Sequence, residues 1–552
     1  MRDEQPAPVD PSAPSRAPEA ARAAPAPGEP QGTSLADRIG MVVGGQFVNT
    51  LIILVQGIVV VRLLGKSEYG VLAFVTMLFM TGRDLAQLYL PESFLYFAPK
   101  VARPELKGLV RQSMLLLLGL GALSALAFSI FAFVPGLFLE DRADVTRLLL
   151  LTGLMSVIAY PASVFGPLFI ATNNHRKSAG VALVVTISSA AGAIVPAALG
   201  CSIAWIVAAQ CAAQALRLWL SYRLYARLFQ DVAVAPFPGG VRAQLAYALP
   251  LSVTRFAGLF NQKLDKFVIG LFFSAGLYAE FAVGSQELPL VGVLAYSVAS
   301  TMLPDLVARV ENGRTPADGA RTAIELWHSG FRKTTLMMLP IAVFLLLFAE
   351  PLMRTVYGDA YAGAAVPFRI YSALLPLRVT AYAIPLMAFG KTSMILRIQA
   401  LGMVFNTAAN LILLPTLGMV GAPLSAVLTQ VIGIVLTVAF IARFSGVGLR
   451  GVFPWAHYGR VAATALVAAA PLTAFLATGA VDRRPALCLT VGAPLYVGLY
   501  LVAAWATGVL APEDRAFVAR WLRLEPLRGR RGGHPHSHRA SPDARGSRPP
   551  RP

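Results

Sequence analysis

The sequence predicts an all-α protein that crosses a membrane about fourteen times. Three observations lead to this fold class. The 552 residues are 56% hydrophobic, and the mean hydropathy of +0.64 lies above the usual range for soluble domains. Only 14% of the residues are charged, and these are clustered rather than spread. Apolar runs recur from residue 40 to residue 510, and each is long enough to cross ~30 Å of hydrocarbon as a helix.

Helices are the expected element of every span, because a segment in lipid must satisfy its backbone hydrogen bonds internally. The segment RLLGKSEYG, residues 62–70, is predicted to be the outer turn of the first hairpin, where Gly65 and Gly70 permit the tight reversal. The apolar runs place the spans at residues 41–63, 70–96, 110–134, 147–172, 178–199, 202–226, 244–272, 276–303, 334–356, 365–389, 394–415, 418–441, 460–480 and 486–509.

The distribution of basic residues predicts the orientation of these spans. The formal net charge of +19 does not indicate nucleic-acid binding, because most basic residues lie in short loops and in the C-terminal tail. With the N-terminus in the cytoplasm, the cytoplasmic loops carry most of the loop lysines and arginines, including Lys100, Arg103, Arg176, Lys177 and Arg450. Such an excess is typical of cytoplasmic loops, so both termini are predicted to be cytoplasmic.

The ends of the chain differ in composition from the apolar middle. Residues 1–39 are rich in Ala and Pro and have no apolar segment typical of a signal peptide, so they are predicted to be a disordered tail. Residues 526–552 are predicted to be a basic disordered tail that contacts anionic headgroups. Between them and the last span, residues 511–525 have the pattern of an amphipathic surface helix.

Two internal similarities predict a duplicated unit. EYGVLAFV at 68–75 resembles LYAEFAVG at 277–284, and PAALGCSIAWIVAAQ at 196–210 resembles PTLGMVGAPLSAVLTQ at 415–430. Both occur in the same order at nearly one spacing, although chance likeness between apolar helices remains the alternative. A parallel repeat of this kind is typical of transporters with two pseudo-symmetric lobes. The predicted parts are an N-terminal six-helix lobe at 40–228, a cytoplasmic linker at 229–243, a C-terminal six-helix lobe at 244–443 and two additional spans at 444–510.

Ionisable side chains occur inside the predicted spans. A charge there costs roughly 2.5–3.5 kcal/mol, so it is expected to face a cavity or a partner. The embedded basic residues outnumber the acids, which favours an anionic substrate, because arginine matches the geometry of phosphate oxygens. Local pairing, such as an Arg83–Asp84 clamp, is the alternative for any one of them. The candidate substrate-binding residues, with a polar stripe in the first span, are Arg83, Arg255, Arg378, Arg217, Lys263, Lys266, Gln46, Asn49 and Gln56.

Three embedded acids, Asp84, Asp265 and Glu287, could bind a coupling proton or Na⁺. The three cysteines form no CxxC motif, so neither a metal site nor a disulfide framework is expected. No predicted outer loop is large enough to suggest catalytic residues, so the sequence indicates neither an enzyme nor a cofactor.

Four segments carry a resemblance to a known family. VVVRLLGKSEYGVLAF, NQKLDKFVIG with GLYAEFAV, YGDAYAGAAVPFRIYSAL and LGMVGAPLSAVLTQ resemble the polysaccharide-biosynthesis family of bacterial membrane proteins. These are O-antigen-flippase-like members of the multidrug/oligosaccharidyl-lipid/polysaccharide (MOP) exporter superfamily. The likeness covers roughly residues 36–510 and rests on the order and spacing of loose motifs.

The resemblance implies a fold of two six-helix lobes around a central cavity, as in MOP and MATE transporters. It also implies a function: alternating access that moves an undecaprenyl-diphosphate-linked oligosaccharide across the bacterial cytoplasmic membrane, with glycosyltransferases and a glycan polymerase as partners. A diphosphate headgroup needs a hydrated route lined by cationic side chains, because moving a bare charge into hydrocarbon is very costly. The alternatives are a lipid II flippase, a multidrug/cation antiporter of the same superfamily and, more remotely, a membrane glycan polymerase or ligase.

Overall fold

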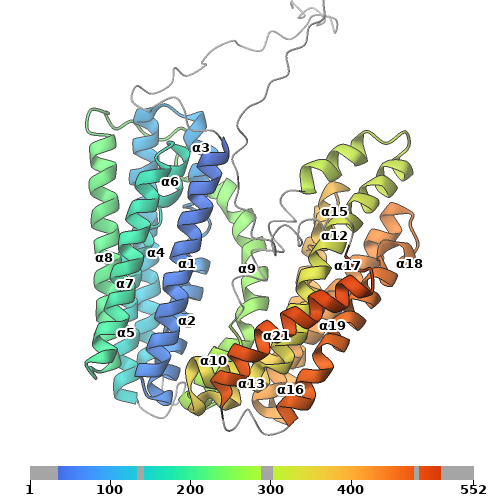
Figure 1. The fold of residues 1–552 in the computed structure, drawn as a ribbon. Helices are drawn as coiled ribbons and strands as arrows, with labels where there is room; N and C mark the ends of the chain where they lie inside the picture. Colours follow the sequence, from blue (N-terminus) through green and yellow to red (C-terminus); the bar gives the residue numbers. More distant parts are fainter. Residues whose placement is uncertain (1–34, 134–141, 287–301, 478–483, 511–552) are drawn as a thin grey trace, which may run out of the picture. The chain divides into compact units, whose positions relative to one another are not determined.

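The computed structural model describes residues 35–133, 142–286, 302–477 and 484–510 (Figure 1). All regular secondary structure in these ranges is helical. Eight helical segments in the described residues are long and apolar enough to cross a membrane. The predicted multi-pass helical fold is therefore confirmed, while the count of fourteen spans stays a prediction. Residues 35–39, predicted as the end of the disordered N-terminal tail, are instead the first residues of a helix. The rest of the two tails and the amphipathic helix predicted at 511–525 lie outside the described residues.

The chain divides into two compact units. The first contains residues 1–64, 82–135 and 141–252, and the second contains residues 65–81, 136–140 and 253–552. The helices that begin in the first unit are α1 Leu35–Leu63, α3 Ser93–Phe97, α4 Arg103–Phe133, α5 Arg142–Ala162, α6 Phe165–Ala171, α7 His175–Ala198, α8 Ile203–Leu228 and α9 Gly240–Phe272.

The helices that begin in the second unit are α2 Lys66–Ala86, α10 Ala275–Gly284, α12 Pro316–Leu347, α13 Ala349–Tyr357, α14 Ala365–Ser372, α15 Ala383–Ala388, α16 Thr392–Leu417, α17 Gly421–Ser445, α18 Leu449–Val452, α19 Trp455–Phe475 and α21 Pro485–Ala506. A further helical segment covers residues 302–311. Both α2 and α9 are divided, because the boundary between the units falls at 81/82 and at 252/253.

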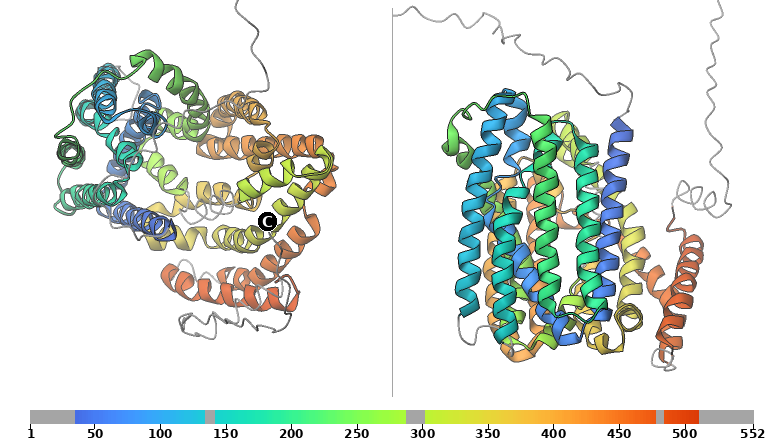
Figure 2. Two further views of the ribbon diagram at one scale, coloured as in Figure 1. Left: turned by 90° about the horizontal axis from the view of Figure 1, so that it is seen from above. Right: turned by 90° about the vertical axis from the view of Figure 1, so that its left-hand side faces the viewer.

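The first unit is a bundle of long helices. Helix α4 packs on α5, α5 on α8, α8 on α7 and α7 on α1, so neighbours in the bundle are not all neighbours in the chain. Figure 2 shows these helices running alongside one another. The segment after α8, predicted as a linker, packs on α4: the Lys107 Nζ donates to the carbonyl oxygens of Phe229 at 3.0 Å and Val232 at 2.7 Å.

Two apolar clusters among the described residues pack helices of the second unit together. One joins α2, α9, α10, α16 and α17 through buried side chains that include Phe74, Ile269 and Tyr278. The other joins α12, α19 and α21 around Phe348 and Tyr496. Shape matching of this kind holds helices together in lipid, where apolar side chains gain little from leaving the solvent.

Two predicted spans are interrupted, which corrects the sequence prediction. The span predicted at 70–96 breaks between α2 and α3, where Leu88 (φ 47°) and Tyr89 (φ 56°) are left-handed. The span predicted at 365–389 breaks between α14 and α15. Prolines explain both breaks, because Pro91 and Pro376 supply no backbone N–H and disfavour a helix through the residue before them.

The predicted first turn is shorter than expected. Helix α1 ends at Leu63 and α2 begins at Lys66, and the Gly65 backbone N–H donates to the Glu68 Oε2 at 3.0 Å. The expectation that Gly70 permits the reversal is wrong. Gly70 lies inside α2, where a Cβ would overlap the Ala275 carbonyl at the start of α10. It therefore allows the backbones of two helices to approach closely.

The segments predicted as internal repeats have similar local geometry. Tyr69 and Tyr278 are each the fourth residue of their helices, α2 and α10, and both are buried. The second pair of segments also shares a feature: Gly200 (φ 67°) follows α7 and Gly418 (φ 60°) follows α16. These equivalences are what a duplicated unit would produce.

Candidate functional site

The embedded ion pair of the first unit is formed by Arg83 and Asp84 near the end of α2. The Arg83 Nε and Nη2 donate to the Asp84 Oδ1 at 3.2 Å and 3.0 Å. The two side chains are 28% and 26% exposed, so the pair is not sealed in the core. A guanidinium has five N–H donors, and an ion pair through two of its nitrogens does not exhaust them.

Two further side chains lie near this pair. Arg83 is close enough to Tyr160 on α5 and to Arg217 on α8 for its charge to act on both. The backbone next to Arg83 also lies close to Tyr160, because a Cβ at Gly82 would stand 3.8 Å from the Tyr160 hydroxyl. Two predicted residues, Arg83 and Arg217, are therefore close enough for their charges to interact, and Asp84 pairs with Arg83.

Three buried polar atoms accompany these charges. The Gln87 Nε2, the Tyr160 hydroxyl and the Gln214 Oε1 have no hydrogen-bond partner among the described residues. Gln87 follows Arg83 by four positions and Gln214 precedes Arg217 by three, which places each glutamine on the helical face of its arginine. The first-unit polar cluster is the set Arg83, Asp84, Gln87, Tyr160, Gln214 and Arg217.

The sequence prediction missed three members of this cluster. The helical spacing of Gln87 and Gln214 from the two arginines could have identified them. Tyr160 gives no such signal, because it lies in an ordinary apolar segment on a helix far along the chain.

One residue of the predicted polar stripe of α1, Asn49, makes a contact between helices. The Thr186 hydroxyl of α7 donates to the Asn49 Oδ1, so this amide joins two helices of the first unit. Gln56 is half-buried, and the side chain of Gln46 lies outside the described residues.

The other predicted basic residues belong to the second unit. Arg255 is exposed on α9, whereas Lys263 and Lys266 are half-buried on the same helix. Arg378 is half-buried and follows the 3₁₀ turn Leu375–Leu377, so it is not inside a continuous helix as predicted. A chamber shared by the arginines of the two units remains a prediction.

Asp265 is the buried acid of the second unit. It is 3% exposed, its Oδ2 accepts a hydrogen bond from the Tyr371 hydroxyl, and its Oδ1 accepts one from the Lys266 backbone N–H at 2.7 Å. Of the other predicted coupling residues, Asp84 is paired with Arg83, and Glu287 lies outside the described residues.

A network of amides connects α9, the helix that carries Asp265, to α16 and α17. The Asn261 Nδ2 donates to the Gln399 carbonyl at 3.1 Å, and the Asn406 Nδ2 donates to the Asn261 carbonyl at 3.2 Å. Asn410 and Ser425 both donate to the Asn406 Oδ1, at 3.0 Å and 3.2 Å. These bonds fasten α9, α16 and α17 to one another.

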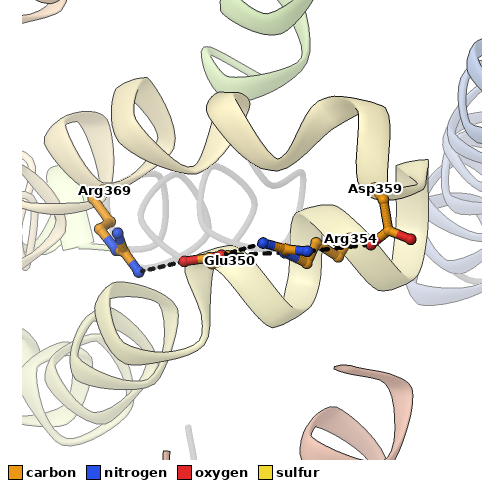
Figure 3. A network of polar contacts seen from close by, with 4 residues as sticks. All are labelled: Glu350, Arg354, Asp359 and Arg369. Carbon is orange, nitrogen blue, oxygen red and sulfur yellow. Dashed lines mark hydrogen bonds and ion pairs between the residues drawn. The ribbon is translucent and has the colours of Figure 1, made fainter. Parts of the chain in front are cut away.

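Ion pairs join the short elements α13, η2 (Asp359–Ala364) and α14. Glu350 binds Arg354 at 2.9 Å and Arg369 at 3.8 Å, while Arg354 also reaches Asp359 at 3.5 Å (Figure 3). Nearby, burial and the Glu280 carboxylate raise the pKa of Tyr361 to about 12, which keeps its hydroxyl neutral at physiological pH. All these acids have cationic partners, since Glu280 pairs with Lys66. The geometry therefore indicates a structural role for this network.

A metal centre has no support in the geometry. Within the residues that the structure describes, no three His, Cys, Asp or Glu side chains come together as metal ligands. The arrangement best suited to a ligand is the first-unit polar cluster, where net positive charge adjoins neutral hydrogen-bonding groups.

Comparison with protein families and curated proteins gives two matches. The model of a family described as "Polysaccharide biosynthesis protein" matches residues 59–366. A protein of Haloferax volcanii named "Probable low-salt glycan biosynthesis flippase Agl15" is 21% identical over 292 residues. This alignment covers 52% of the present chain and 58% of that protein, so the chain spans little more than half the length of its curated relative.

Two solved structures have a similar fold. "Lipid II flippase MurJ, inward closed conformation" is 13% identical, covers 84% of this chain and 98% of its own, and has a TM-score of 0.68. An "inward-facing conformation of a multidrug resistance MATE family transporter of the MOP superfamily" is 14% identical, covers 72% and 96%, and has a TM-score of 0.51. At such low identity these likenesses show the fold.

Proposed function

The chain belongs to the polysaccharide biosynthesis protein family, and from this membership we propose that it is a flippase for lipid-linked oligosaccharide. The substrate is an oligosaccharide on undecaprenyl diphosphate, and the protein moves it across the cytoplasmic membrane by alternating access. Both termini are cytoplasmic. The enzymes that supply the substrate are glycosyltransferases, and a glycan polymerase consumes it.

The observation that carries this proposal is the proximity of two embedded arginines, Arg83 and Arg217. Asp84 pairs with Arg83, so these three side chains together carry a net positive charge. A diphosphate requires such a place, because taking its charge out of water is very costly without replacement partners. Arg255, Arg378, Lys263 and Lys266 add positive charge in the second unit.

Lipid II flipping is the second candidate, and one observation favours it. The structural likeness to a lipid II flippase covers 84% of this chain. Lipid II and lipid-linked oligosaccharides both carry a diphosphate, so the arginines do not distinguish the two substrates. The multidrug/cation antiporter is disfavoured by the surplus of embedded basic residues.

Movement of the substrate is proposed to be coupled to a proton or Na⁺ at an embedded acid. Asp265 is the strongest of the three candidates, because it is buried and accepts hydrogen bonds from a tyrosine hydroxyl and a backbone N–H. Asp84 and Glu287 are the other two.

The test measures flipping by the purified protein in proteoliposomes. With lipid-linked oligosaccharide, Arg83→Ala, Arg255→Ala and Arg378→Ala should each lower the rate at least about tenfold, as expected when an interaction with a charged group is removed. The matched control is Arg321→Ala, which removes an arginine whose side chain is 75% exposed. Wild-type rates in all three variants would refute the proposal, and faster flipping of lipid II would favour the second candidate.

A further inference from the structure

The first-unit polar cluster contains neutral groups that its charges do not explain. Tyr160 is fully buried, with Ser124 and Ser156 beside its hydroxyl, and none of the described residues meets that hydroxyl with full hydrogen-bond geometry. In the described part of the chain the Gln87 Nε2 and the Gln214 Oε1 also have no partner. Buried polar groups left unsatisfied destabilise a fold, and inside a membrane they mark functional sites.

The types of these atoms restrict the ligand. The oxygens of an ionised phosphate only accept hydrogen bonds, so they can bind the arginines and the Gln87 amide N–H. They cannot satisfy the Gln214 Oε1, which is itself an acceptor. A group that satisfies both glutamines must donate as well as accept. A hydroxyl does so, and sugars present several hydroxyls at short spacing.

We propose that Gln87, Tyr160 and Gln214 bind the first sugar of the substrate, next to the diphosphate held by Arg83 and Arg217. This inference rests on the proposed function and extends it from charge recognition to sugar recognition. The first-unit polar cluster then has a division of roles, in which the guanidinium groups bind any isoprenoid diphosphate and the neutral groups distinguish a glycosylated one.

The positions of the residues support this division. Gln87 directly follows the end of α2, one turn beyond Arg83, and Gln214 lies one turn before Arg217 on α8. Tyr160 comes from α5, which packs against α8. The two residues after Gln87, Leu88 and Tyr89, have left-handed backbone. Left-handed backbone is unfavourable for such residues and is found preferentially at functional sites.

The experiment measures binding to the full chain in lipid nanodiscs with two kinds of probe. One probe is undecaprenyl diphosphate, which has no sugar. The others are undecaprenyl diphosphates that carry N-acetylglucosamine, glucose or galactose. The variants are Gln214→Leu, Gln87→Leu and Tyr160→Phe. Gln210→Leu is the matched control on α8, because Gln210 is already hydrogen-bonded to Ser189 of α7.

The wild type should bind at least one sugar-bearing probe more tightly than the sugarless one. Gln214→Leu should weaken the sugar-bearing probe about tenfold, since a site that loses one hydrogen bond to a hydroxyl loses that preference. Its affinity for undecaprenyl diphosphate should change less than about twofold, which also shows that the variant is folded. Arg217→Ala should weaken both kinds of probe, and Gln210→Leu neither.

Two outcomes would overturn the inference while leaving the proposed function intact. Equal wild-type affinity for the sugarless probe and every sugar-bearing probe would mean that the cluster holds only water. Wild-type discrimination retained in all three variants would place sugar recognition elsewhere. Failure of the wild type to bind any of the probes would instead reject the proposed function, and with it this inference.

Discussion

Two glutamines of the first unit, Gln244, which is fully buried, and Gln214, which is half-buried, differ in how their amides are satisfied. The Gln244 Oε1 accepts from Gln112 at 2.9 Å, and its Nε2 donates to Ser93 at 3.0 Å and to Ser113 at 2.8 Å. The Gln214 Oε1, by contrast, has no partner in the described residues. Gln244 thus joins α3, α4 and α9 through its hydrogen bonds. An apolar side chain of similar size could replace the Gln214 Oε1 without the loss of any such bond. The difference separates a structural amide from one kept for a ligand.

The largest effect should follow from breaking the satisfied network. Gln244→Leu removes three interhelical hydrogen bonds, and at ~0.6 kcal/mol each the loss of stability should be about 2 kcal/mol. The measurement is the Tm of the purified protein in detergent. Gln112→Leu is the graded control, because it removes only one of the three bonds. An unchanged Tm for Gln244→Leu would show that hydrogen-bond satisfaction does not identify structural amides in this protein.

A second substitution extends the comparison to Asp265. Both of its carboxylate oxygens accept hydrogen bonds, yet it is proposed to act in transport. Asp265→Asn keeps an acceptor oxygen for the Lys266 backbone N–H, and its Nδ2 can donate to the Tyr371 hydroxyl oxygen, so stability should change by less than about 1 kcal/mol. The acceleration of flipping by a proton or Na⁺ gradient should fall about tenfold. Flipping in proteoliposomes with and without each gradient measures this. A gradient response equal to that of the wild type would remove Asp265 from the coupling proposal.

The smallest effect, and one of opposite sign, is expected at the unsatisfied glutamine. Gln214→Leu replaces a buried acceptor that lacks a partner in the described residues, so stability should be unchanged or rise by up to about 1 kcal/mol. The Tm in detergent without added lipid-linked substrate measures it. A fall as large as that of Gln244→Leu would assign Gln214 to packing and weaken the comparison.

Much of the architecture was predictable because it depends on local composition. Hydropathy identified the apolar helices, and the embedded charges, two arginines and one aspartate, identified half of the first-unit polar cluster. The two interrupted spans were predicted as continuous helices, although Pro91 and Pro376 marked the breaks. Hydropathy averaged over a long window does not detect a helix break caused by one proline. Both prolines lie in apolar segments, so the averaged hydropathy stayed high across each break.

The roles of individual polar and small residues were less predictable. Gly70 was assigned to a turn, but the structure uses it for close contact with Ala275, which lies more than two hundred positions later in the chain. Asn49 was assigned to a polar stripe, but it hydrogen-bonds to Thr186 on another helix. Tyr160 was not singled out. In each case the decisive neighbour is remote in sequence.

The sequence by itself determined that this chain spans a membrane through apolar helices and carries an excess of embedded positive charge. Each helix in a membrane forms its own backbone hydrogen bonds and presents its own apolar side chains to lipid. Membrane-spanning helices and embedded charges can therefore be recognised from each segment of the sequence separately. Only the tertiary structure decided which polar groups are satisfied. Gln244 hydrogen-bonds to Ser113, which is 131 positions away in the chain. Whether an amide finds such a partner on another helix is decided only when the helices pack.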